Sequence, residues 1–173
     1  TYSHAHGRFY VATPIRLDNR LAPYRIGWVD EPVAPENWDA LRQFRDRCDV
    51  PVCVGERLYT RWQFRPVLEQ KLAEYIMPDI IRTGGISEMK RIAVLGETFN
   101  KQFLPHQTQP TIGMAANLHV IASLRDAPLP QEYKGVAERL AALFVEPIDI
   151  KEGHLHPPPG PGRGITIERA ASA

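Results

Sequence analysis

The sequence predicts an α/β fold in which parallel strands alternate with helices, as in a β/α barrel. Five apolar segments each end in a polar residue, and the steps between these residues are 26, 23, 27 and 26 along the series Asp30, Glu56, Asp79, His106 and Glu132. A strand, a loop and a returning helix take about that length. Because the carboxyl ends of the strands in a β/α barrel face the active site, we expect all five polar residues to lie there.

Four of the apolar segments have the pattern of buried parallel strands. They are short apolar runs, as expected when helices cover one face of a sheet and packed side chains fill the other. These predicted strands cover residues 26–30, 50–56, 75–79 and 102–106. A further strand is expected to end at Glu132.

Amphipathic stretches between and after these runs predict four helices. Their apolar stripes fall within residues 38–48, 64–73, 89–95 and 113–124. Ser87, after the pair Gly84-Gly85, is the predicted N-cap of the third helix. The proline-rich run 157–162 is incompatible with a helix or a central strand, so we expect an ordered loop or a tail there.

Length and composition indicate one globular domain. The chain has 173 residues, of which 43% are hydrophobic and 24% charged, enough to bury a substantial core. The 21 basic and 20 acidic residues form no basic block, which argues against a nucleic-acid partner. No apolar run approaches the roughly 20 residues that span a bilayer, so we expect no membrane association and a cytoplasmic location. Cys48 and Cys53 are predicted to be reduced core residues.

Several segments together resemble the barrel domain of the enolase superfamily. More narrowly they are similar to the mandelate racemase and muconate lactonizing branch, nearest to acid-sugar dehydratases of the galactonate dehydratase type. The segments are Trp28-Val29-Asp30-Glu31-Pro32, Val54-Gly55-Glu56-Arg57, Met77-Pro78-Asp79 with Thr83-Gly84-Gly85-Ile86, Pro105-His106, and Pro159-Gly160-Pro161-Gly162-Arg163-Gly164. The resemblance runs from about residue 4 to residue 165, almost the whole chain.

This resemblance implies a TIM-type (β/α) barrel that is incomplete. The chain would supply about strands 3 to 8, whereas a whole barrel has eight strands. Residues 1–173 would then be a partial C-terminal barrel domain, without the family's N-terminal capping domain and first barrel strands. We expect such a chain to be poorly stable or to associate through open edges, and to be inactive alone.

The resemblance also implies a divalent metal ion, usually Mg²⁺, that holds the substrate carboxylate and stabilises an enediolate. Its ligands fall on His4, Asp30 and Glu56. The family has aspartate where His4 stands, and an imidazole suits zinc, iron or nickel better than Mg²⁺. We therefore expect a weakened or altered preference, with Mn²⁺ or another divalent ion as a candidate. The alternatives are an ordinary histidine near a chain end and two carboxylates that cap helices.

Proton transfer is expected from two histidines. His106 with Asp79 resembles the family's histidine–aspartate dyad, in which the carboxylate orients the imidazole; the alternative is a core histidine bonded to a carbonyl. His6, in His4-Ala5-His6-Gly7-Arg8, stands where the galactonate dehydratase type has a second histidine. One histidine would take the proton α to the carboxylate and the other would protonate the departing hydroxyl. Glu132 resembles the carboxylate that binds the substrate carboxylate or enediolate.

Other patterns have a plain structural reading beside the functional one. His154-Leu155-His156 is either half of a zinc site or a surface loop. Gly84-Gly85 either binds phosphate or makes a tight turn. Three arginines lie just beyond strand ends and either meet an anionic substrate or are solvated charges: Arg57, Arg61 and Arg82.

Three functions remain open on the sequence. The first is a metal-dependent lyase that dehydrates an acid sugar, a small-molecule carboxylate, and that forms a homo-oligomer in its full-length form. The second is a racemase, epimerase or cycloisomerase of the same superfamily. The third is an inactive fragment or a noncatalytic relative that binds only metal.

Overall fold

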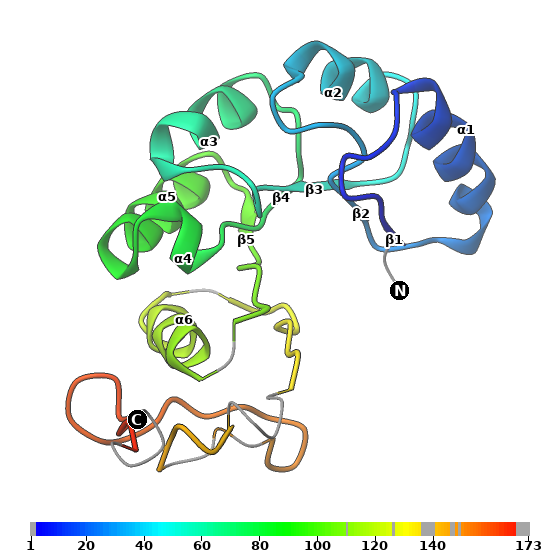
Figure 1. Cartoon of the computed structure of the whole chain (residues 1–173). Helices are drawn as coiled ribbons and strands as arrows, with labels where there is room; N and C mark the ends of the chain where they lie inside the picture. The colour runs from blue at the N-terminus through cyan, green and yellow to red at the C-terminus, as the bar shows by residue number, and fades with distance from the viewer. Residues whose placement is uncertain are drawn as a thin grey trace. The chain divides into compact units, whose positions relative to one another are not determined.

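One parallel sheet of five strands forms the frame of the chain's first part (Figure 1). The computed structural model describes residues 3–109, 111–125, 127–135, 141–145, 148 and 150–168. The chain divides into two compact units, Thr1–Leu104 and Pro105–Ala173. The sheet belongs to the first unit.

The strands follow one another in the sheet in the same order as in the chain. They are β1 (Ser3–His4), β2 (Val29–Asp30), β3 (Val52–Val54), β4 (Tyr75–Ile76) and β5 (Gln102–Phe103). All pairs are parallel, with His4 opposite Asp30 and Asp30 opposite Cys53. The predicted alternation and parallel pairing are confirmed. Strands β2 to β5 are each shorter than the apolar run that predicted them, and β1 was not among the predicted apolar runs.

The strand expected to end at Glu132 is not present. Residues 127–135 contain no strand, and so the described part of the chain has five sheet strands, where the family resemblance implied about six. Pro128 and Pro130 precede Glu132. Proline has no backbone N–H to donate to a neighbouring strand, so the two prolines disfavour a strand in this segment.

Helices lie along one side of the sheet in the first unit (Figure 1). They are α1 (Ala12–Leu21), α2 (Trp38–Arg45), α3 (Thr60–Glu69), α4 (Ile80–Thr83) and α5 (Ile86–Thr98), with a short 3-10 turn at Ala22–Tyr24. Three of them match predicted stripes, while α1 and α4 were not predicted. The stripe of α1 is hard to recognise, because its buried residues are Pro14 and Asp18.

The predicted N-cap at Ser87 is wrong. Helix α5 begins at Ile86, so that Ser87 lies inside its first turn, and Gly85 takes the N-cap position without a side-chain hydrogen bond. Gly84 and Gly85 have φ angles of 109° and 88°, which disfavour other residues. They join α4 to α5 in a tight turn, as the structural reading of this pair expected.

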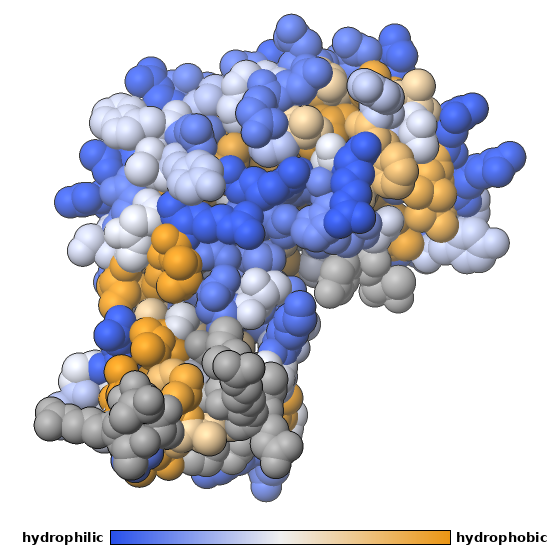
Figure 2. Space-filling view, viewed as in Figure 1, coloured by the Kyte–Doolittle hydropathy of each residue, from blue (hydrophilic) through white to orange (hydrophobic). Residues whose placement is uncertain are grey.

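The core of the first unit fills the space between the sheet and the helices. Phe44, Phe64, Ile76, Met89 and Ile92 are all fully buried, and α3 packs against α5. The free thiols Cys48 and Cys53 are buried too, as predicted; burial raises the pKa of the Cys48 thiol to about 11. The surface of this unit is mostly hydrophilic in the view of Figure 2, consistent with apolar burial driving the fold.

The second unit is built on α6 (Ile112–Ala122). Met114, Ala115 and Leu118 of this helix pack with Ile148, and Tyr133 and Ile165 lie against them. The proline-rich run 157–162 forms bends and turns without a helix or strand, as predicted. No helix in the described part of either unit has the length and apolar character that crossing a membrane requires.

A buried carboxyl on α1 predicts a dependence of stability on pH. Asp18 is 1% exposed, and its burial raises the pKa from 3.8 to about 6. The folded state therefore binds the proton more tightly than the unfolded state. The stability that this provides is fully present below pH 3.8 and is lost as pH rises through about 6. We expect Asp18→Asn to remove this loss, so that the variant gains stability over the parent as pH rises.

Urea denaturation of both proteins at about pH 4 and about pH 7 measures this difference. Asp46→Asn, at an exposed position, is the matched control. A difference between Asp18→Asn and the parent that stays constant with pH would contradict the prediction.

Candidate metal centre and acid-base residues

Three neighbouring strands bring three of the predicted site residues to one end of the sheet. His4 ends β1, Asp30 ends β2, and Glu56 follows β3 by two residues. His4 and Asp30 are register partners, and His4 Nδ1 lies 3.4 Å from Asp30 Oδ2. Regular strand register therefore places the predicted ligands on adjacent strands.

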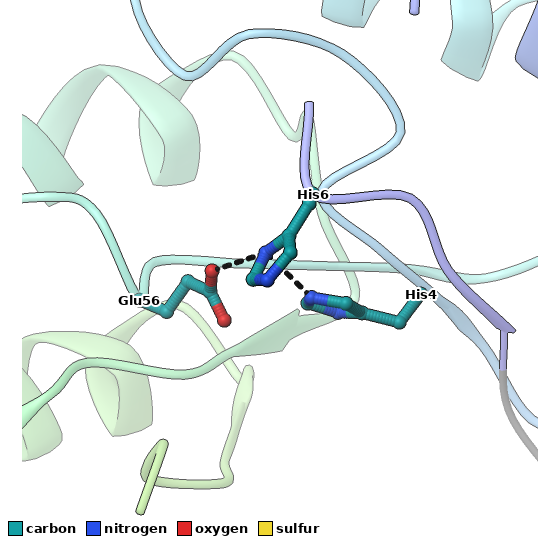
Figure 3. A group of neighbouring side chains, drawn as sticks. All are labelled: His4, His6 and Glu56. Carbon is teal, nitrogen blue, oxygen red and sulfur yellow. Dashed lines mark hydrogen bonds and ion pairs between the residues drawn. The ribbon is translucent and has the colours of Figure 1, made fainter. Parts of the chain in front are cut away.

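A second histidine joins this group (Figure 3). His4 Nε2 lies 2.7 Å from His6 Nδ1, and His6 Nδ1 lies 3.0 Å from Glu56 Oε1. One ligand atom from each of these three residues lies within 4.8 Å of the other two. We call His4, His6 and Glu56 the His-His-Glu cluster. Among the residues that the structure describes, it is the one group of three such side chains close enough to hold a metal ion.

The chain bends sharply after β1, and this bend carries His6 to the cluster. Ala5 N–H still donates to Asp30 O at 3.0 Å, after which His6 and Gly7 take left-handed φ angles of 56° and 57°. Gly7 N–H then donates to Glu31 O at 2.7 Å. A Cβ at Gly7 would lie 2.7 Å from Val33 O. Only glycine fits both the backbone conformation and the space.

Buried carboxylates lie within and beside the cluster. Asp30 is 4%, Glu31 1% and Glu56 2% exposed. Burial raises the pKa of Glu31, while the ion pair with Arg57 opposes that rise. Charged groups at such burial need partners, and Arg57 supplies one for Glu31.

The arginines beyond the strand ends are held by the protein. Arg57 pairs with Glu31, and Arg61 Nη1 lies 2.6 Å from Glu88 Oε2. Arg82 donates from Nη1 to the main-chain oxygen of Glu56 at 2.9 Å. These contacts favour a structural role for the three arginines. The sequence had offered two other interpretations, contact with an anionic substrate and a solvated charge. Glu31 and Glu88 were not singled out from sequence, because buried ion pairs between distant segments leave no local pattern.

Asp79 caps the helix that follows it. Its Oδ1 accepts hydrogen bonds from the main-chain N–H groups of Ile81 at 2.8 Å and Arg82 at 3.2 Å, at the start of α4. The side chain is buried, with the residue 1% exposed. Asp79 lies in the first compact unit and His106 in the second, and their predicted dyad stays a prediction.

His106 and Glu132 come together within the second unit. His106 Nε2 lies 4.0 Å from Glu132 Oε2, and the same oxygen accepts from Gln107 N at 2.7 Å. Asn117 on α6 donates to Gln107 Oε1 at 2.9 Å and to His106 O at 3.4 Å. Asn117 was not singled out from the sequence. The signal that could have identified it is a single amide side chain within an otherwise apolar helix, because a buried amide needs hydrogen-bond partners.

The His154-Leu155-His156 segment follows the surface-loop reading. Both histidines are exposed, and Lys151 and His154 exchange main-chain hydrogen bonds of 2.8 and 2.9 Å in a short turn. Within the described residues, no third ligand joins them in a potential metal group.

Comparison with known proteins points to one family. The family model described as "Enolase C-terminal domain-like" matches residues 3–171. A D-galactonate dehydratase family member from Streptomyces bingchenggensis is 29% identical over 98% of the chain and 41% of its own length. Arabinonate dehydratase from Saccharolobus solfataricus is 30% identical over 88% of the chain and 41% of its own length. The chain thus spans about two fifths of the curated relatives it matches.

The chain is also similar to a solved structure. It is an enolase from Pantoea ananatis with bound d-gluconate and Mg, 29% identical to this chain, with a TM-score of 0.88. The similarity covers 99% of this chain and 41% of that one.

Proposed function

Since the chain belongs to the enolase C-terminal domain-like family, we propose that it is part of a lyase that removes the proton α to a carboxylate and eliminates water from an acid sugar. The observation that carries this proposal is the position of His4, Asp30 and Glu56 at one end of three neighbouring strands. In β/α barrels this end carries the active site. The names of the dehydratase relatives support acid sugars as the substrate class.

The reaction needs two proton transfers. A base takes the proton from the carbon next to the carboxylate, and an acid gives a proton to the hydroxyl on the following carbon, which leaves as water. The enol that remains becomes a 2-keto-3-deoxy acid. We propose that His6 and His106 supply the two transfers, since imidazole exchanges protons near neutral pH.

His6 is suited to this role by its contacts. Glu56 Oε1 lies 3.0 Å from its Nδ1, so this nitrogen is already engaged by the protein. We propose the other ring nitrogen, Nε2, as the atom that exchanges a proton with substrate. The side chain is 47% exposed, so solvent and small molecules can reach it.

His106, Glu132 and Asp79 form the second part of the proposal. His106 is 7% exposed, and its Nε2 lies 4.0 Å from the Glu132 carboxylate, which also accepts the Gln107 N–H. We propose that Asp79 orients His106 and that Glu132 contacts the substrate carboxylate.

The donor atoms gathered at the strand ends do not fit the Mg²⁺ of the family. Mg²⁺ demands oxygen ligands in a near-octahedral set, whereas the His-His-Glu cluster offers two ring nitrogens and one carboxylate oxygen. Asp30 adds a buried carboxylate beside His4. We propose that a divalent ion binds at this end of the sheet and assign no step of the reaction to Mg²⁺.

Product analysis in D₂O tests the reaction. The protein that carries this chain is incubated with galactonate, arabinonate and gluconate in turn, and the products are followed by NMR. Dehydration gives a 2-keto-3-deoxy acid with deuterium on the carbon that lost the hydroxyl. A racemase or epimerase, the second candidate, would place deuterium on the carbon next to the carboxylate without loss of water.

The third candidate, a noncatalytic relative that binds metal, predicts neither product. Absence of both loss of water and exchange, in a folded protein that binds a divalent ion, would refute the lyase and support that candidate.

A further inference from the structure

We infer that the His-His-Glu cluster is a binding site for a borderline divalent metal ion of the Zn²⁺ or Co²⁺ class, with Nδ1 of His6 as a ligand and Asp30 as the residue that orients His4. The resemblance places His6 in proton transfer and Asp30 among the ligands, so this assignment differs in both residues. It concerns metal binding alone, and its test is independent of the proposed reaction.

The positions of the donor atoms are the first argument. His4 Nε2, His6 Nδ1 and Glu56 Oε1 meet in one place, with separations of 2.7 Å and 3.0 Å along the series. They come from the end of β1, the bend after it and the loop after β3 (Figure 3). All three donor atoms lie within 4.8 Å of one another, close enough for one small ion to be shared among them, and they come from segments that the sheet register holds together.

The second argument is the tautomer of His4. Its Nδ1 faces Asp30 Oδ2 at 3.4 Å, so the carboxylate favours the proton on Nδ1 and leaves the lone pair on Nε2. Nε2 is the nitrogen that lies in the cluster. A metal-bound histidine commonly gives its other N–H to a carboxylate, which fixes the ring and strengthens its donor nitrogen. Asp30, at 4% exposure, is placed for this orienting role.

The third argument is the chemistry of the donor set. Two neutral imidazoles and one carboxylate carry one negative charge, less than an all-carboxylate Mg²⁺ site. Imidazole suits Zn²⁺, Fe²⁺, Co²⁺ and Ni²⁺ as a ligand. These ions generally bind nitrogen donors more tightly than Mn²⁺ does. Mg²⁺ sheds its water reluctantly and favours oxygen. The site should therefore select against Mg²⁺.

Metal binding on Nδ1 leaves the other ring nitrogen of His6 with its proton. Such an N–H can donate a hydrogen bond to a substrate hydroxyl, whereas the proton transfer proposed for His6 belongs to the ring without a bound ion.

A titration of the metal-free chain with Co²⁺, followed by displacement with Zn²⁺ and with Mg²⁺, tests the inference. Co²⁺ reports on nitrogen ligands through its visible absorption, so the readout does not depend on activity. We expect one bound ion per chain, displaced by Zn²⁺ but not by equal concentrations of Mg²⁺. His6→Gln should lower Zn²⁺ affinity by more than about 10-fold and change the Co²⁺ spectrum, and His4→Gln should act alike. Asp30→Asn should cost about 10–100-fold and keep the spectrum, as expected when an orienting partner is lost.

The chain contains its own matched control in the second His-x-His segment. His154→Gln with His156→Gln removes two exposed histidines that lack a third ligand among the described residues, and it should leave affinity and spectrum unchanged. Circular dichroism establishes that each variant is folded. Zn²⁺ affinity of folded His6→Gln equal to that of the parent, or displacement of Co²⁺ by equal Mg²⁺, would overturn the inference. Failure of the dehydration assay alone would leave it standing.

Discussion

Replacement of His106 by asparagine is expected to lower kcat of the proposed dehydration about 10²–10⁴-fold, the usual contribution of a positioned acid or base. Asparagine keeps a polar amide near the position of the histidine Nδ1 but cannot exchange a proton. The main-chain contacts of this position, including the bond from Asn117 to His106 O, do not depend on the imidazole, so the fold should survive. Steady-state kinetics on an acid sugar, with circular dichroism of both proteins, measures the effect.

His156→Asn is the matched control for this substitution. His156 lies in the same compact unit and is exposed, so its replacement should leave kcat within about 2-fold of the parent, as for most surface changes. Equal rates for His106→Asn and the parent would exclude His106 from proton transfer and also remove the reason for the dyad with Asp79. A fall in kcat together with loss of helical signal would show a structural role instead.

The sheet could be predicted from the sequence because polar residues at the ends of apolar segments recur at nearly regular intervals. Each strand end in the first unit carries a polar residue at a repeat of about one strand and one helix, so Asp30 and Glu56 could be placed without long-range contacts. The same reasoning failed at Glu132, where the spacing continued but Pro128 and Pro130 disfavour a strand. Spacing predicts where a strand can end, while backbone hydrogen-bonding capacity decides whether one forms.

The details of the candidate metal centre could not be predicted in this way. Whether His6 turns toward Glu56 depends on left-handed conformations at His6 and Gly7, and an isolated His-Ala-His-Gly segment does not dictate them. The orientation of His4 depends on Asp30 of the neighbouring strand, and the buried Glu31 depends on Arg57. These side-chain orientations are determined by tertiary contacts, which cannot be inferred from local sequence patterns.

Replacement of Phe64 by alanine is expected to cost about 3–5 kcal/mol of unfolding free energy, the range for truncation of a buried phenylalanine. Phe64 on α3 is fully buried, and α3 packs against α5. Its ring also lies against the main chain at Gly55, since a Cβ there would come within 2.6 Å of Phe64 Cε1. Gly55 immediately precedes Glu56, so the cavity would open beneath the loop that supplies a predicted metal ligand.

Trp62→Ala is the control that distinguishes the effect of losing a buried ring from the effect of losing an exposed aromatic side chain. Trp62 lies on the same helix but is 64% exposed, and its ring contacts Arg61 at 4.8 Å from the centroid. Such an exposed cation–π contact is worth about 0.5–1 kcal/mol, so Trp62→Ala should cost far less than Phe64→Ala in urea denaturation. Phe64→Leu, which keeps most of the apolar volume, should lie between the two. Equal costs for Phe64→Ala and Trp62→Ala would mean that the α3 core does not limit stability. In that case the position of Glu56 would depend on the strand register alone.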